Sequence, residues 1–198
     1  MPGSQRRFMR SVHVVAIALL VAGGVVASSG TAVARADPPP RVTGLPSTIT
    51  IGDSVMLGAR WVLRKRGVAV VDAKESRQAY TAPGLMKRRG ARLPSNVVVH
   101  LGTNGSFSTS ICKDIMLAAG PARRVFMVTI AVPRSWERRN NALIRRCAAS
   151  SPGRTFLIDW HRVAARHPKW LYSDHVHLRP TGAKGYARMI AHAVKSAS

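Results

Sequence analysis

The sequence predicts an α/β fold, a three-layer α/β/α sandwich around a five-stranded parallel sheet. Two observations predict this fold class. Five short runs of apolar and β-branched residues alternate with segments of helical spacing along the 198 residues. The third run is apolar almost throughout, as in sheets that are covered by helices on both sides. Strands that alternate with helices are joined by right-handed crossovers, which make the sheet parallel.

The first half of the chain supplies three strands and two helices. Residues 47–51 form a β-branched run, and residues 55–66 show helical spacing that ends at Gly67. Residues 96–101 are apolar almost throughout, which favours a strand buried on both faces. The other elements of this half are a strand at 68–71 and a helix at 80–89.

The second half supplies the remaining two strands and three helices. A helix at 110–119 ends where Gly120 and Pro121 follow, since glycine favours a helix end and proline cannot continue a helix. An irregular stretch is predicted between the fifth strand and the last helix. The other elements of this half are strands at 124–132 and 155–160 and helices at 137–148 and 183–195.

The N-terminus has the features of an export signal. Three arginines within the first ten residues precede a charge-free apolar segment, and Ala34 and Ala36 have the spacing that signal peptidase cleaves. An uncleaved anchor helix is the alternative, but glycine and serine in the second half of the segment disfavour a membrane span. We therefore expect a signal peptide at 1–36, a proline-rich mature N-terminus at 37–46 and one folded domain at 47–198.

The charge is strongly positive, with 31 Lys and Arg against 8 Asp and Glu, a formal net charge of +23. Cleavage after Ala36 removes four arginines and no acid, which leaves 162 residues with a net charge of +19. Such a charge favours a polyanionic partner. An exported protein meets anionic wall polymers and lipid headgroups, so we expect those partners, no nucleic acid, and a monomer.

Cys112 and Cys147 are the two cysteines of the chain. In an oxidising compartment they predict one disulfide, whose closed loop of 36 residues stabilises the fold by about 3–4 kcal/mol in the chain-entropy model. Two buried free thiols are the alternative. No CxxC or Cys/His zinc spacing occurs in the sequence.

Polar side chains follow the predicted strands, where ligands bind in such folds. Ser54 follows the first strand in a tight turn that exposes its hydroxyl and leaves its N–H free, although it can also merely cap the helix. Asn104 follows the third strand and can donate its side-chain N–H, or form a turn. Asp174 precedes His177 by three residues and can orient the imidazole as a base, or both can lie in a solvated turn.

In this chain order, GDSV at 52–55, a donor loop at 72–78, GTN at 102–104 and DxxH at 174–177 resemble the SGNH (GDSL-type) hydrolase superfamily, over about residues 47–195. The resemblance is nearest to the extracytoplasmic domains of bacterial cell-wall O-acetyltransferases and their stand-alone relatives, on the segments at 71–74, 133–137 and 157–160. It implies a flavodoxin-like SGNH hydrolase fold. It also implies a serine esterase or acyl-transfer enzyme that needs no cofactor and acts on acyl, chiefly acetyl, esters of cell-envelope glycans or lipids.

The resemblance implies a role for each motif residue. Ser54 matches the nucleophile, His177 the general base and Asp174 the carboxylate that orients it. The oxyanion hole comprises the backbone N–H of Ser54, the side chain of Asn104 and the backbone N–H of Ser76, where the family normally has glycine. Four residues after strand ends are expected to line the acceptor site, although Trp136 can equally pack on the next helix: Arg77, Gln78, Arg134 and Trp136.

Three other functions remain open at this point. The same triad can transfer the acyl group to a wall sugar from a separate donor. A non-catalytic envelope-binding module would keep the fold and use Ser54 only as a cap. A metal-dependent hydrolase would draw on a cluster of acids and histidines, although we expect no metal: Asp53, Asp72, Asp159, His161, His167, Asp174, His175 and His177.

Overall fold

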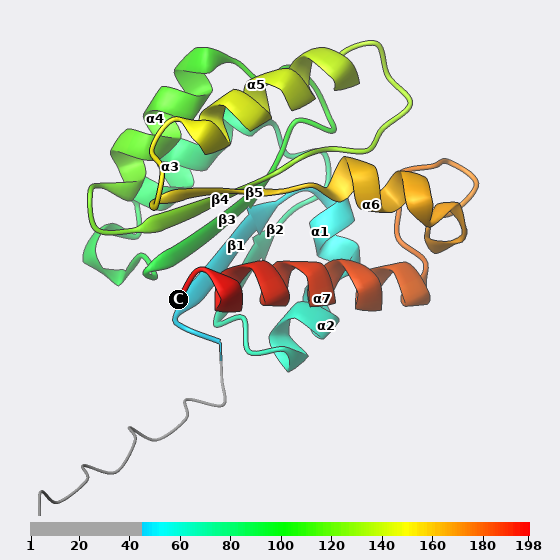
Figure 1. Cartoon of the computed structure of the whole chain (residues 1–198), viewed down its shortest axis with the longest axis horizontal. Helices are drawn as coiled ribbons and strands as arrows, with labels where there is room; N and C mark the ends of the chain where they lie inside the picture. The colour runs from blue at the N-terminus through cyan, green and yellow to red at the C-terminus, as the bar shows by residue number, and fades with distance from the viewer. Residues whose placement is uncertain (1–44) are drawn as a thin grey trace, which may run out of the picture. The chain divides into compact units, whose positions relative to one another are not determined.

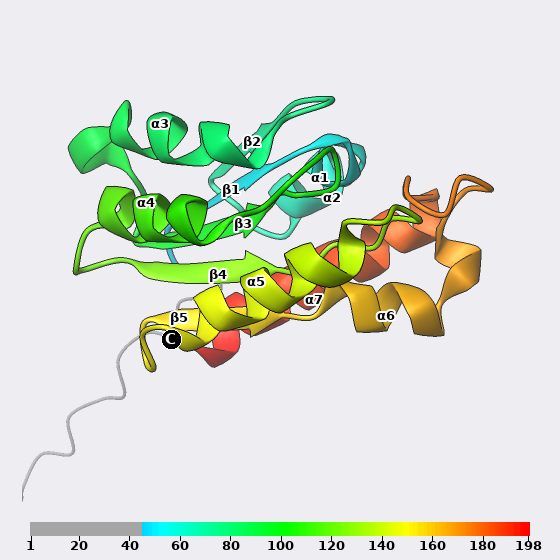
Figure 2. The same cartoon turned by 90° about the horizontal axis from the view of Figure 1, so that it is seen from above.

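The computed structural model describes residues 45–198 and confirms the predicted fold class. All five strands are parallel and lie side by side in the order β2–β1–β3–β4–β5 (Figure 2). This is the flavodoxin-like order. The strands are β1 (Thr48–Gly52), β2 (Val70–Ala73), β3 (Asn96–His100), β4 (Arg124–Val128) and β5 (Thr155–Ile158).

Helices cover both faces of the sheet (Figure 1). One layer consists of α3 (Ala82–Lys87), α4 (Thr109–Ala119) and α5 (Glu137–Ala149). The other consists of α1 (Ser54–Gly58), α2 (Arg60–Lys65), α6 (Trp160–Arg166) and α7 (Pro180–Ser196). Short 3-10 turns lie at Ala79–Thr81, Gly90–Arg92 and Pro168–Trp170.

Alternation along the buried strands explains the two layers. In β3, Val97 and Val99 pack against the α3–α5 layer, whereas Val98 packs against the α1–α7 layer. In β4, Val125 and Phe126 divide in the same way. Successive side chains of a strand point to opposite faces, so each strand contributes to both cores.

The prediction that the fourth strand runs to residue 132 is wrong, because side chains of α5 take over its backbone hydrogen bonds. Asn141 accepts from the N–H of Ile130 at 2.8 Å and donates to its carbonyl at 2.9 Å. Glu137 accepts from the N–H of Val132 at 3.0 Å. The strand therefore ends at Val128.

The bounds of several other predicted elements also need correction. The helix predicted at 55–66 is two helices joined at Ala59. The fifth strand ends at Ile158, and part of the stretch predicted as irregular is the helix α6. The side chain of Asp159 caps the first turn of α6 by accepting from the N–H of Arg162 at 3.3 Å. The last helix begins at Pro180, a residue favoured in the first helical turn because it needs no N–H acceptor there.

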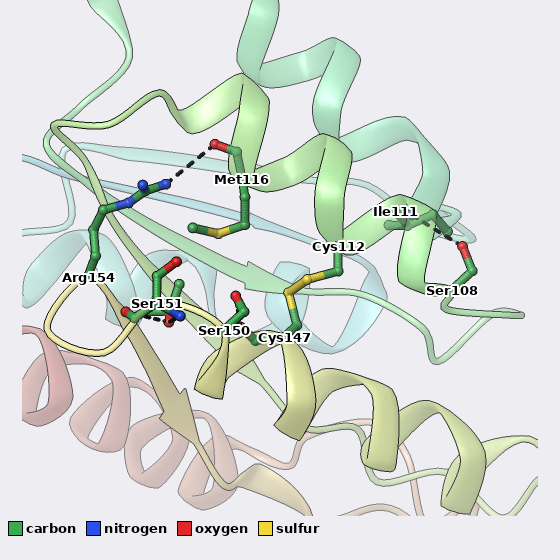
Figure 3. Close-up of a disulfide and its surroundings, with 9 residues drawn as sticks. Ser108, Ile111, Cys112, Met116, Cys147, Ser150, Ser151 and Arg154 are labelled. Atoms are coloured by element: carbon green, nitrogen blue, oxygen red, sulfur yellow. Dashed lines mark hydrogen bonds between the residues drawn. A yellow bond between two sulfur atoms is a disulfide. The ribbon is translucent and has the colours of Figure 1, made fainter.

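The predicted disulfide is confirmed (Figure 3). Cys112 on α4 and Cys147 on α5 are bonded, with their Cα atoms 5.8 Å apart.

The predicted signal peptide at 1–36 and most of the proline-rich segment at 37–46 lie outside the described residues. Within residues 45–198, no helix combines the length and apolar character that a membrane span requires.

Candidate active site

The three predicted triad residues meet at the carboxyl end of the sheet. The Nε2 atom of His177 lies 3.0 Å from the Ser54 hydroxyl, and its Nδ1 atom lies 2.6 Å from a carboxylate oxygen of Asp174. A carboxylate only accepts hydrogen bonds, so Nδ1 carries the proton and Nε2 presents a lone pair to the hydroxyl. The sequence separation between Ser54 and His177 is 123 residues, and the fold alone brings them together.

Asp174 is held as a carboxylate by the loop that it begins. Its second oxygen accepts from the backbone N–H groups of Val176 and His177 at 2.9 and 3.0 Å. Partial burial raises the pKa of Asp174, but the hydrogen bonds from the His177 side chain and these N–H groups outweigh it and lower the pKa from 3.8 to about 2. The imidazole therefore faces a negatively charged carboxylate at any pH well above 2.

Ser54 lies at the N-terminus of α1, where backbone N–H groups have no acceptor within the helix. Asp53, fully buried, caps this helix by accepting from the N–H of Val55 at 3.1 Å. The Nδ2 atom of Asn104 is buried, and no acceptor for it lies within residues 45–198. The side-chain N–H of Asn104 thus has no acceptor of its own among these residues, as is expected of an oxyanion donor.

Ser76, the third predicted donor, lines the same cleft as Ser54 and Asn104. Its φ is +53°, in the left-handed region that costs a residue other than glycine about 1–2 kcal/mol. The backbone keeps the conformation that a glycine would adopt without cost. His175, in the loop before α7, is held at φ +58° in the same way.

Two amide side chains hold the loop that carries Asn104. Gln78 donates to the Asn104 carbonyl at 2.8 Å. Asn140, on α5, donates to the carbonyls of Gly102 and Gly105 at 3.0 and 2.8 Å. Gln78 was predicted to line the site of the acceptor sugar, but in the structure its side-chain amide is hydrogen-bonded to the loop that carries Asn104. Asn140 was not predicted, because a buried asparagine within a helix has no sequence signature.

The cleft around the triad has a volume of about 750 Å³. Five of its lining residues were not predicted: Leu57, Gly58, Arg60 and Trp61 lie one or two helical turns after the GDSV motif, and Glu75 lies within the donor loop but was given no role. The complete lining is Ser54, Leu57, Gly58, Arg60, Trp61, Glu75, Ser76, Asn104 and His177.

The other residues that were predicted to line the acceptor-sugar site do not line this cleft. Arg77 donates to Asp72 at 2.8 Å, and Arg89 donates to the other oxygen of the same carboxylate at 2.9 Å. Burial raises the pKa of Asp72, but these two hydrogen bonds outweigh it and lower the pKa below its usual value. Trp136 packs against the α3–α5 core, and Arg134 is exposed on the loop before α5.

A buried polar pair lies between the sheet and α7. His100, at the end of β3, has its Nδ1 atom 2.7 Å from the hydroxyl of Tyr186. Burial lowers the pKa of His100, although the charge of Asp53 opposes this, and burial together with the same charge raises the pKa of Tyr186. Both groups are therefore neutral and support the site without titrating near neutral pH.

The residues of the metal hypothesis are dispersed. Asp159 pairs with Arg145 at 2.9 Å, and His161 lies 3.0 Å from Glu137. The His167 ring stacks on another aromatic ring, that of Trp170. Within residues 45–198, no three His, Cys, Asp or Glu side chains come together in a group able to hold a metal ion.

Known cell-wall enzymes resemble this chain in sequence and in structure. No family model matches the chain. The O-acetyltransferase OatA of Staphylococcus aureus is 35% identical over 148 residues, which cover 73% of this chain and 24% of that protein. The catalytic C-terminal domain of the Streptococcus pneumoniae peptidoglycan O-acetyltransferase OatA, solved with a methylsulfonyl adduct, superposes with a TM-score of 0.63. It is 26% identical, and the match covers 78% of this chain and 96% of that domain.

The chain has the SGNH hydrolase fold. A GDSL-family lipolytic protein of Veillonella parvula shares the SGNH fold at a TM-score of 0.53 and 14% identity, over 76% of this chain and 96% of that one. The predicted resemblance is thus confirmed, with peptidoglycan O-acetyltransferases among the homologues. This SGNH chain spans about a quarter of the length of the curated relative.

Proposed function

We propose that this chain is a secreted serine enzyme that transfers acyl groups, chiefly acetyl, from esters of cell-envelope glycans to a sugar hydroxyl or to water. The observation that carries the proposal is the hydrogen-bonded series from Ser54 through His177 to Asp174, with the free N–H of Asn104 beside it. Peptidoglycan O-acetyltransferase relatives support the glycan substrate. The disulfide supports an oxidising compartment.

The geometry supports a double displacement. His177 takes the proton of the Ser54 hydroxyl through Nε2 while the oxygen attacks the ester carbonyl carbon. The N–H groups of Ser54, Ser76 and Asn104 stabilise the oxyanion. When the carbon–oxygen bond to the alcohol breaks, His177 returns the proton to the departing oxygen, and an acyl-Ser54 remains. A second hydroxyl, from a sugar or from water, then gives its proton to His177 and releases the acyl group by the reverse steps.

A single set of assays tests the serine mechanism. The purified protein is expected to hydrolyse p-nitrophenyl acetate in the presence of EDTA and to be labelled by a serine-directed phosphonate. Ser54→Ala should abolish turnover and labelling, whereas Ser110→Ala, an exposed serine on α4, should retain both. Unchanged turnover in Ser54→Ala would refute the mechanism, and loss of turnover with EDTA would favour the metal hypothesis.

The acceptor is a separate question, because water and a sugar hydroxyl use the same triad. The O-acetyltransferase relatives favour the sugar. Incubation with an acetyl donor and a wall oligosaccharide, followed by mass analysis, distinguishes the two outcomes. Acetylated oligosaccharide indicates transfer, and free acetate alone indicates hydrolysis.

The positive charge supports an anionic envelope partner. An excess of 23 basic over acidic residues attracts phosphate-rich wall polymers or anionic headgroups, and this attraction is screened by salt. Binding to isolated walls should therefore fall steeply with salt, while turnover of a neutral soluble ester should change little.

A further inference from the structure

The cleft extends beyond the triad along α1 and α2. Ser54, Gly58 and Trp61 all line it. They follow one another at intervals of four and three residues, and Ala59, which joins the two helices, keeps right-handed helical backbone. Trp61 thus lies two helical turns from the nucleophile, about 10 Å along the axis. That is about the length of a disaccharide.

The Trp61 side chain is available to a ligand. The residue is 61% exposed, whereas Leu63, two positions on, is fully buried against α7 and the sheet. The guanidinium carbons of Arg60 and Arg64 lie 4.9 and 5.5 Å from the ring centre. These cation–π contacts orient the ring while it stays exposed.

The two arginines can also bind an anion. Among residues 45–198, no carboxylate forms an ion pair with Arg60 or Arg64. A guanidinium that stacks on an aromatic ring keeps its in-plane N–H donors, which match the two oxygens of a carboxylate. Glu75, the acidic residue of the cleft, lies beside Ser76 in the loop after β2.

Gly58 keeps the path between Ser54 and Trp61 open. A Cβ atom at this position would meet no other atom within 4 Å, so the space above it is free. Gly58 is the last residue of α1, and its φ is not in the left-handed region, so the backbone conformation does not require glycine there. Open space next to an exposed aromatic ring is what an extended ligand needs.

We propose that Trp61, Arg60 and Arg64 form a sugar subsite that binds a pyranose ring bearing a carboxylate, one to two rings away from the ester that Ser54 attacks. The carboxylate accepts from the guanidinium groups of Arg60 and Arg64, and the pyranose ring packs against the part of the indole that these groups leave exposed. The subsite rests on the proposed function, since it selects the glycan whose ester the triad attacks.

The test compares two substrates in the full chain. The measured quantity is kcat/KM on an O-acetylated wall oligosaccharide divided by kcat/KM on p-nitrophenyl acetate. Trp61→Ala should lower this ratio about tenfold, the effect of losing one stacking contact. Tyr172→Ala is the matched control, because Tyr172 is also an exposed aromatic residue beside an arginine, Arg179 at 5.0 Å, but lies outside the cleft. It should leave the ratio unchanged.

Two further variants separate the parts of the proposal. Arg60→Gln with Arg64→Gln should remove the preference for the native oligosaccharide over one whose carboxylates are amidated. Gly58→Phe should lower the ratio as Trp61→Ala does, while Gly58→Ala should lower it less. An unchanged ratio in both Trp61→Ala and Gly58→Phe, or an unchanged carboxylate preference in the double arginine variant, would overturn the subsite. Turnover that survives Ser54→Ala would instead overturn the proposed function.

Discussion

Asn104 offers the sharpest test of the oxyanion hole. Its Nδ2 atom is buried and finds no acceptor within residues 45–198, while its backbone carbonyl accepts from Gln78 at 2.8 Å. Asn104→Ala therefore removes a donor that makes no bond in the resting protein, and it leaves the bond that holds the loop.

The magnitudes for activity and stability differ as a result. Loss of one oxyanion donor costs about 2.7–4 kcal/mol of transition-state stabilisation, which lowers kcat by about 100- to 1,000-fold. No hydrogen-bond partner of Nδ2 is left unsatisfied, so the free energy of unfolding should change by no more than about 0.5 kcal/mol. For a domain of this size that corresponds to a Tm change of about 1–2 °C.

The assay measures kcat on p-nitrophenyl acetate and Tm for the wild type, Asn104→Ala and Asn104→Asp. The aspartate is nearly isosteric and presents a negative oxygen in place of the N–H, so it should lose at least as much activity as the alanine. If either variant stays within threefold of the wild-type kcat, the oxyanion role of Asn104 is refuted. A large fall in Tm together with kcat would assign the residue to the loop instead.

Three further predictions concern stability. Replacing both Cys112 and Cys147 by alanine opens a 36-residue loop whose closure stabilises the fold by about 3–4 kcal/mol, so Tm should fall by about 8–15 °C. Reduction of the wild type should give the same fall, and a shift below about 3 °C would contradict the prediction. Ser76→Gly relieves the strain of a left-handed backbone and, after the entropy cost of glycine is subtracted, should raise the free energy of unfolding by about 0.5–1 kcal/mol, measured by urea titration. Ser173→Gly is the control, because φ is not positive there, and it should lower the free energy of unfolding. Asp72→Asn leaves the nearly buried Arg77 without its ion pair and should lower the free energy of unfolding by about 1–3 kcal/mol at pH 7. Because the folded pKa of Asp72 is lowered, this difference is present above about pH 4 and should diminish as the pH falls further, so a difference constant with pH would contradict the assignment.

Much of the fold follows from local patterns. The apolar run at 96–101 and the helical spacing at 55–66 predicted a strand and helical turns close to where they occur. The predicted fourth strand was too long, because Ile130 and Val132 are β-branched residues of the kind that strands favour. Only the contact with Asn141 and Glu137 of α5 reveals that their backbone groups are bonded elsewhere.

The sequence by itself determined the fold class and the chain order of the motifs, because each depends on residue types at short spacing. It also left only one possible partner for each cysteine, and the structure shows that the two are bonded. The tertiary structure decided which side chains share the cleft. The strand order places the loops after β1, β2 and β3 beside one another, so Ser54, Ser76 and Asn104 meet, while Arg77 turns to Asp72. It also brought Trp61 into the same cleft. Such neighbours depend on contacts between distant segments, which local propensity does not encode.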